Sequence, residues 1–97
     1  MKFEWDPAKA AANFIKHRVR FDEAITVFKD PLALIFDDVF HSEQEHREII
    51  IGMSSVSRLL LVCFTERRED VLRLISARRA TRQEIQDYEE NARNQAS

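Results

Sequence analysis

Three apolar segments joined by short polar ones constrain the fold of this chain more than any other feature. Residues 47–53 contain three consecutive Ile, residues 58–65 contain three consecutive Leu, and residues 71–77 form a third segment rich in aliphatic residues. The polar segments 54–57 and 66–70 separate them, which predicts three strands joined as an antiparallel meander. Consecutive aliphatic residues are typical of strands that are covered on both faces.

Helix signals precede these strands. Asp6-Pro7 predicts a helix start, because Asp accepts hydrogen bonds from free backbone N–H groups and Pro fits the first turn. We expect this helix to end near Arg18. A second helix is predicted over residues 21–29, where apolar residues recur at helical spacing before a proline. The residues expected on the buried face of the first helix are Ala8, Ala11 and either Phe14 or Ile15.

A final helix is predicted after the third strand. Thr81 and Glu84 have the spacing of a capping box, in which the two side chains bond the free N–H groups of a first helical turn. We expect this helix to run to about Ala92 and residues 94–97 to fray. Its inward residues are expected to be Ile85, Tyr88 and Ala92.

These elements predict an α+β fold with a small antiparallel β-sheet, two N-terminal helices and one C-terminal helix, within a single domain over residues 1–97. Further short strands are expected at residues 2–5 and 32–36, and a polar loop at 40–46. The two N-terminal helices are expected to cover one face of the sheet. With 44% hydrophobic residues, the chain has the apolar surface that a core needs.

The single cysteine and the N-terminus bear on location. Cys63 has no partner for an internal disulfide, and its apolar neighbours predict a small core residue. The N-terminal residues carry charges where a secretory signal would be apolar, and no apolar run is long enough to cross a bilayer. We therefore expect a cytoplasmic protein with no membrane partner.

Positive charge is concentrated in one segment, although the chain has a formal net charge of −2. Residues 66–82 hold six arginines against three acidic residues. A guanidinium can bind phosphate through two parallel hydrogen bonds, so the segment predicts contact with a nucleic-acid backbone. The competing interpretation is that these arginines pair with neighbouring carboxylates. The six are Arg67, Arg68, Arg73, Arg78, Arg79 and Arg82.

Several common sites are excluded by residue type. Gly52 is the single glycine, so the chain has no glycine-rich phosphate loop. No Cys/His set has the spacing of a structural zinc site. His41 and His46 stand five residues apart, which aligns them neither on a helix nor on one face of a strand. We expect a solvated loop there, with no metal and no cofactor.

Arg, Glu and His together suit RNA cleavage by the RNA's own 2′-hydroxyl. A base removes the 2′ proton, an acid protonates the leaving 5′ oxygen, and cations stabilise the phosphorane. The sequence leaves the base and the acid open among Glu66, His17, His41 and His46.

Motifs along nearly the whole chain resemble, in order, those of the BrnT toxins. They are Phe3-Glu4-Trp5-Asp6, Lys16-His17, Asp30-Pro31, Ile51-Gly52, Thr65-Glu66-Arg67 and, most specifically, Ile75-Ser76-Ala77-Arg78-Arg79-Ala80-Thr81. The resemblance implies a RelE-like fold and a metal-independent ribonuclease that blocks translation. It also implies a BrnA-like antitoxin with a ribbon-helix-helix part, and a 2:2 complex that binds operator DNA through that antitoxin.

The resemblance also implies roles for particular residues. Catalytic roles are expected for Glu66, Arg67, Arg78 and Arg79, and then for Lys16 and His17. Contacts with RNA are expected for Arg68, Arg73 and Arg82.

Each role competes with a structural one. Lys16 and His17 would complement the negative C-terminal end of the first helix, Glu66 and Arg67 would pair within a turn, and Arg79 would pair with Glu84 or Asp87. Two other functions compete as well. One is a non-catalytic module that docks its antitoxin in a repressor complex, and the other is an RNA-binding protein that slows ribosomes without cutting.

The chain departs from the family's usual pattern at three turns. Arg18 stands where many members have a glycine after the Lys-His pair, a position where a helix end favours positive φ. The turns at residues 54–57 and 67–70 also lack the glycine that is common there. These changes concern backbone geometry rather than chemistry.

Overall fold

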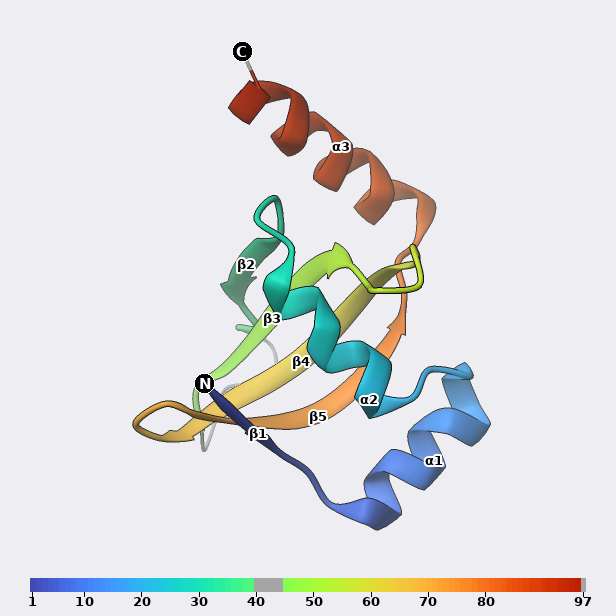
Figure 1. Ribbon diagram of the computed structural model, residues 1–97, viewed down its shortest axis with the longest axis vertical. Helices are drawn as coiled ribbons and strands as arrows, with labels where there is room; N and C mark the ends of the chain where they lie inside the picture. The colour runs from blue at the N-terminus through green and yellow to red at the C-terminus, as the bar shows by residue number, and fades with distance from the viewer. Residues whose placement is uncertain (40–44, 97) are drawn as a thin grey trace.

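The computed structural model describes residues 1–39 and 45–96 of the chain. In these residues a first strand and helix precede a short second helix, a 3₁₀ turn, four strands and a long final helix (Figure 1). Their bounds are β1 Lys2–Glu4, α1 Pro7–His17, α2 Phe21–Ala24, η1 Ile25–Lys29, β2 Leu34–Asp37, β3 Arg47–Met53, β4 Leu59–Arg68, β5 Val71–Arg79 and α3 Arg82–Ala96.

The strands form one sheet in the order β1-β5-β4-β3-β2. The pairs β2–β3, β3–β4 and β4–β5 are antiparallel, which confirms the predicted meander. Strand β1 pairs parallel to β5, with Lys2 opposite Val71 and Glu4 opposite Arg73. This pairing joins the two ends of the chain's strand region, and hydrophobic spacing alone does not reveal such a long-range contact.

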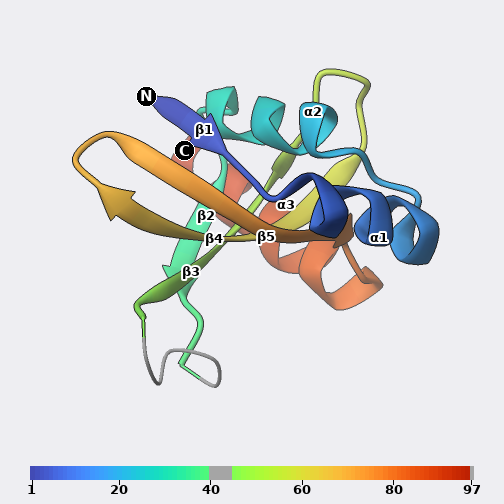
Figure 2. The same ribbon diagram turned by 90° about the horizontal axis from the view of Figure 1, so that it is seen from below.

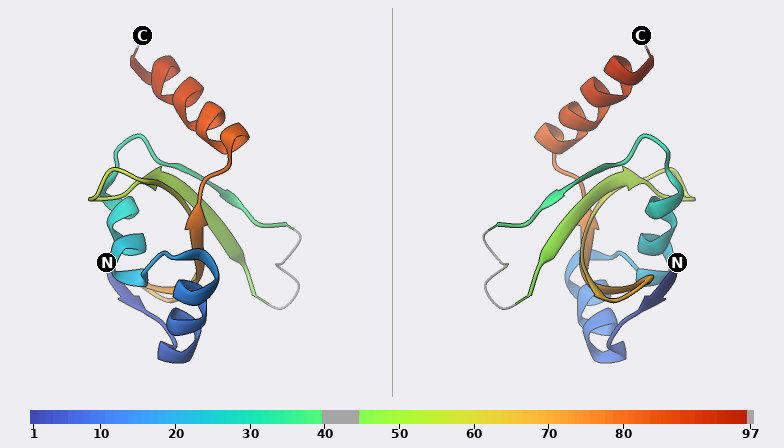
Figure 3. Two further views of the ribbon diagram at one scale, coloured as in Figure 1. Left: turned by 90° about the vertical axis from the view of Figure 1, so that its right-hand side faces the viewer. Right: turned by 90° about the vertical axis from the view of Figure 1, so that its left-hand side faces the viewer.

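Helices cover the sheet on both faces, as Figure 2 shows. α1, α2 and η1 pack on one face around a core that includes Phe21, Val27 and Leu60, which confirms the predicted cover by the N-terminal helices. α3 lies on the other face, where Tyr88 packs with Ile51 and Leu61. Only its first turns lie near the sheet, and its C-terminal end extends beyond the strands (Figure 3). No helix of the described residues has the length and apolar character needed to cross a membrane.

The packed face of α1 differs from the expected one. Ala8 and Ala11 are exposed and Ile15 is 73% exposed, whereas Asn13 is buried. The Asn13 amide donates to the carbonyl oxygens of Val19 and Ala77 at 3.0 and 2.8 Å, and its oxygen accepts from the Ala77 N–H at 3.0 Å. The spacing of apolar residues cannot predict this buried face, because the residue at its centre is polar.

Several predicted boundaries are corrected. The expected turn at 66–70 is shorter, because β4 continues through Arg68 and β5 begins at Val71. The expected helix at 21–29 is divided into α2 and the 3₁₀ segment η1. α3 continues to Ala96 instead of fraying from residue 94, since its last turn contains neither glycine nor proline and Arg93, Gln95 and Ala96 are good helix formers.

Three turns use the left-handed backbone region without glycine. Arg18, Ser57 and Asp70 have φ of 58°, 63° and 63°. Arg18 caps the C-terminal end of α1, and its N–H bonds the carbonyl of Phe14 at 2.8 Å. These are the three places where the sequence lacks an expected glycine, so the backbone geometry is kept at a cost of about 1 kcal/mol per residue.

Asp30 ties α3 to the rest of the fold. Its carboxylate accepts hydrogen bonds from the N–H groups of Leu32 and Met53 and from the Tyr88 hydroxyl, at 2.9, 2.8 and 2.7 Å. Burial raises the pKa of this carboxyl, but these hydrogen bonds outweigh it and hold the pKa below its usual value. Burial and the contact with Asp30 raise the pKa of Tyr88 to about 12.

We expect Asn13→Ala to destabilise the protein strongly. The substitution leaves three buried backbone groups without partners, and at a typical 1–3 kcal/mol for each such group the loss is about 3 kcal/mol or more. Urea unfolding measures it, with Gln86→Ala as the control because Gln86 is exposed on α3. Equal unfolding midpoints for Asn13→Ala and wild type would contradict this role.

The Tyr88–Asp30 contact predicts a specific alkaline transition. The pKa of Tyr88 is about 12 in the folded chain against an ordinary 10.0, so its contribution is complete below pH 10 and is lost as pH rises towards 12. Tyr88 is the single tyrosine, so tyrosinate absorbance reports it directly. We expect a midpoint near 12 when folded and near 10 in urea. A folded midpoint near 10 would show that the contact does not hold.

Candidate functional site

A pocket of about 430 Å³ opens on the α3 face of the sheet, and we call it the Arg78 pocket. It contains guanidinium, imidazole, carboxylate, hydroxyl and thiol groups above an apolar floor. The lining residues are His17, Phe36, Asp38, Arg47, Ile49, Leu61, Cys63, Ile75, Ser76, Arg78 and Glu84.

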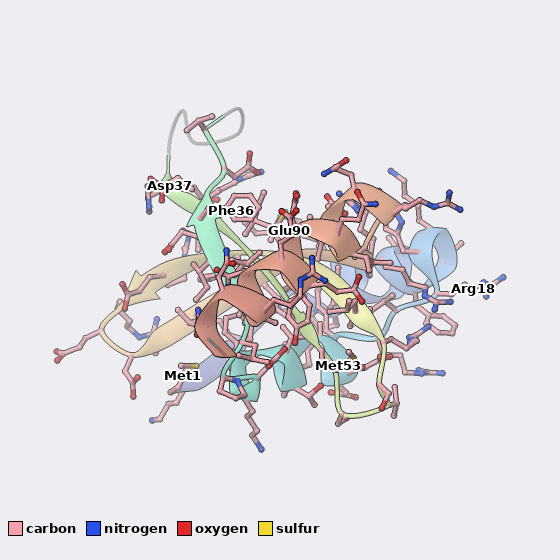
Figure 4. The ribbon with its side chains drawn as sticks, turned by 90° about the horizontal axis from the view of Figure 1, so that it is seen from above. Met1, Arg18, Phe36, Asp37, Met53 and Glu90 are labelled. Carbon is pink, nitrogen blue, oxygen red and sulfur yellow. The ribbon has the colours of Figure 1, made fainter. Side chains whose placement is uncertain are left out.

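Strand register brings these groups together. Arg78 lies opposite Leu61 and Ser76 lies opposite Cys63, so alternate residues of β4 and β5 share this face. Asn13 holds α1 to Ala77, which places His17, at the end of α1, at the same rim as Arg78. In Figure 4, α3 crosses this face, with Phe36 beside it on β2.

Arg78 is fixed by Glu84, from the first turn of α3. Two guanidinium nitrogens donate to the two carboxylate oxygens at 2.8 and 2.9 Å, and one of them also donates to the Arg79 carbonyl at 3.2 Å. The hydrogen bonds from Arg78 keep the pKa of Glu84 below its usual value, so the pair stays charged. Within the described residues these bonds use three of the five N–H groups, which leaves two for an anion in the pocket.

The capping box predicted at this helix start is present. The Thr81 N–H donates to Glu84 at 2.8 Å, and the Glu84 N–H donates to the Thr81 hydroxyl at 3.3 Å. Glu84 therefore begins α3 and orients Arg78 with the same carboxylate.

A second arginine of the pocket was not predicted as a site residue. Arg47 begins β3 and lies 3.4 Å from Glu45, which also accepts from Arg67 at 3.3 Å. Arg67 itself lies six residues beyond Leu61 along β4, which is about 20 Å from Arg78. Among the hydrogen bonds and ion pairs of residues 1–39 and 45–96, Glu45 links Arg67 to Arg47 of the pocket. Only the register of β3 on β4 shows that Arg47 belongs here.

The remaining predicted residues lie elsewhere. Arg79 follows Arg78 on the strand and faces the opposite side, where it helps Arg58, the main cause, to lower the pKa of Glu23. The expected pairing of Arg79 with Glu84 is thus made by Arg78 instead. Arg73, which we expected to contact RNA, donates to Glu4 at 2.9 Å, and Arg68 lies 3.7 Å from the same carboxylate. Lys16, Glu66 and Arg82 are exposed outside the pocket.

Cys63 lines the pocket rather than being fully enclosed in the core. It is half-buried, and burial raises the pKa of its thiol above the usual value. The thiol therefore stays protonated near neutral pH, which disfavours a nucleophilic role.

His46 lies outside the pocket in an acidic cluster. Its Nε2 is 3.1 Å from Asp37, and the possible ligand atoms of Asp37, His46 and Glu48 all lie within 4.8 Å of one another. No spacing in the sequence indicated that His46 lies beside carboxylates of two strands. The other loop histidine, His41, lies outside the described residues.

Comparison with known proteins places this arrangement in a family. Residues 5–84 match the family model described as the ribonuclease toxin BrnT of type II toxin–antitoxin systems. The chain belongs to the BrnT family. Its match covers the strands and helix ends that build the Arg78 pocket, and the expected resemblance is confirmed.

A solved structure agrees with this assignment. The crystal structure of the Brucella abortus ribonuclease toxin BrnT is 25% identical to this toxin, with a TM-score of 0.65, over 84% of this chain and 99% of that one. The α+β fold expected from the sequence is thereby confirmed, with a sheet that is mostly antiparallel. No curated protein matches the sequence. As a type II toxin, the protein has an antitoxin as its partner.

We expect Glu84→Ala to weaken both α3 and the position of Arg78. The substitution removes the capping box and leaves Arg78 without its carboxylate, which together cost about 1–3 kcal/mol. Thermal unfolding measures this, with Glu90→Ala as the control on an exposed carboxylate of the same helix (Figure 4). If both variants melted alike, Glu84 would have no such double role.

Proposed function

We propose that this toxin is an endoribonuclease that needs no metal, cuts RNA in the Arg78 pocket and thereby blocks translation in the cytoplasm. The observation that carries the proposal is the convergence of Arg78, Arg47 and His17 in one pocket of a ribonuclease toxin family member. Two guanidinium groups supply the positive charge that divalent ions supply in many other nucleases. A dianionic phosphorane is the species that such a pair stabilises best.

The reaction follows from the groups in the pocket. The 2′-hydroxyl oxygen attacks phosphorus, the bond to the 5′ oxygen breaks, and a 2′,3′-cyclic phosphate and a 5′-hydroxyl end result. His17 takes the 2′ proton, because it is the one imidazole in the lining described here. Water protonates the leaving oxygen. Arg78, held by Glu84, uses its remaining N–H groups on the non-bridging oxygens.

The other predicted residues then act at a distance. Arg67, Arg68 and Arg82 are exposed, and they suit contact with RNA phosphates outside the pocket rather than with the reacting group. Glu66 lies on the hairpin with Arg67, so we assign it no proton transfer. Arg73 and Arg79 serve the fold through Glu4 and Glu23.

The antitoxin completes the proposal. A BrnA-like protein with a ribbon-helix-helix part covers the Arg78 pocket with an acidic or apolar segment and binds operator DNA in a 2:2 complex. The cationic pocket supports this, because a surface built for phosphate also attracts carboxylates.

Cleavage of total RNA by the purified toxin in EDTA tests the proposal. We expect cleavage by wild type, a loss of about 100-fold or more in Arg78→Ala, since one donor to a developing oxyanion is worth that much, and a comparable loss in His17→Asn. Arg93→Ala is the matched control, because Arg93 lies on α3 outside the pocket. Circular dichroism confirms that each variant is folded.

Two outcomes would contradict the proposal. Cleavage that appears only with Mg²⁺ and is lost in Asp37→Asn would assign the chemistry to the cluster with His46. No cleavage by folded wild type, even with ribosomes present, would favour the non-catalytic module that docks its antitoxin.

A further inference from the structure

A second pocket lies against α1, away from the Arg78 pocket. It has a volume of about 360 Å³, and we call it the α1 pocket. Its walls are mostly aromatic and aliphatic, and the residues that matter here are Trp5, Phe14, Ile15, Arg20, Phe21 and Asp22. Ile15 is 73% exposed, so most of a bulky apolar side chain at this rim is open to solvent.

The two pockets are separated by α1 itself. Ile15 lines the α1 pocket and His17 lines the Arg78 pocket. Two residues of an α-helix differ by about 200° around its axis, so these side chains point to opposite sides. A molecule in one pocket therefore leaves the other open.

Two arginines place positive charge at the α1 pocket. The guanidinium carbon of Arg20 lies 4.4 Å from the centre of the Phe14 ring, and that of Arg18 lies 5.6 Å from it. Neither forms an ion pair with a carboxylate of the described residues. Arg18 occupies the C-terminal cap of α1 although its φ of 58° would suit glycine better. The rim thus offers cations beside an apolar cavity.

An apolar and acidic peptide fits these features better than RNA does. The Phe14 ring is already stacked by the Arg20 guanidinium, and Trp5 is half-buried with its ring centre 5.8 Å from that of Phe21, so both rings already pack within the protein. Asp22 also lines the pocket, and it disfavours RNA, which carries a charge on every nucleotide, more than a peptide that places one carboxylate on the arginines and apolar groups elsewhere. The free guanidinium groups attract carboxylates.

We propose that the α1 pocket is a docking site for the antitoxin, which inserts a bulky aliphatic side chain against Ile15 and Phe14 and places a carboxylate on Arg18 and Arg20. The antitoxin makes this contact in addition to the contact by which it covers the Arg78 pocket. It rests on the antitoxin partner of the family and is independent of whether Arg78 takes part in cleavage.

Affinity for the purified cognate antitoxin tests the site, measured by calorimetry beside RNA cleavage in EDTA. We expect Ile15→Glu and Arg20→Glu each to weaken antitoxin binding about 10-fold or more, with cleavage unchanged within twofold. Val56→Glu and Lys29→Glu are matched controls, because both residues are exposed outside the pocket. Since the four positions are exposed, the substitutions leave the fold intact, and thermal unfolding checks this.

Two results would overturn the proposal. Unchanged antitoxin affinity in both variants would remove the docking site and leave the ribonuclease proposal intact, because that depends on Arg78→Ala and His17→Asn. Reduced cleavage with unchanged antitoxin affinity would assign the α1 pocket to RNA.

Discussion

The side-chain amide of Asn13 is the contact on which the rest of the arrangement depends. β1 ends opposite Arg73, so the edge of β5 has no strand beside Ala77. Asn13 bonds both the N–H and the carbonyl of Ala77, as a neighbouring strand would, and also holds the carbonyl of Val19. One buried amide thereby fixes the end of α1 beside the residue that precedes Arg78. The Arg78 pocket and the α1 pocket both have walls on a helix positioned in this way.

Local patterns in the sequence predict the elements of this fold well. Runs of aliphatic residues separated by polar turns predicted the meander, Asp6-Pro7 predicted the start of α1, and Thr81 with Glu84 predicted the start of α3. The packed face of α1 could not be predicted, because the residue at its centre is an amide that bonds Ala77, 64 positions away. Hydrophobic spacing indicates which apolar groups are buried. It carries no information about a polar contact between residues that lie far apart in the sequence.

The candidate site likewise contains residues that local motifs predict and residues that only the three-dimensional structure reveals. Arg78 and His17 were predicted from motifs, and the structure brings them to one pocket. Arg47 was missed because only strand register shows that it belongs there, and Arg79 was grouped with Arg78 although consecutive strand residues face opposite sides. Glu84 illustrates the difference between pattern and contact. Its spacing from Thr81 revealed a helix start, whereas its pairing with Arg78 appeared only in three dimensions.

The outer edge of the sheet has a consequence for the amount of this toxin that a cell can hold. β2 is the last strand in the order, and its residues Ile35 and Phe36 are 55% and 45% exposed. An edge strand with apolar side chains and open backbone groups is a template for pairing with other chains. Because such pairing needs two chains, it grows with the concentration of free toxin and removes chains from the soluble pool when the toxin is made in excess.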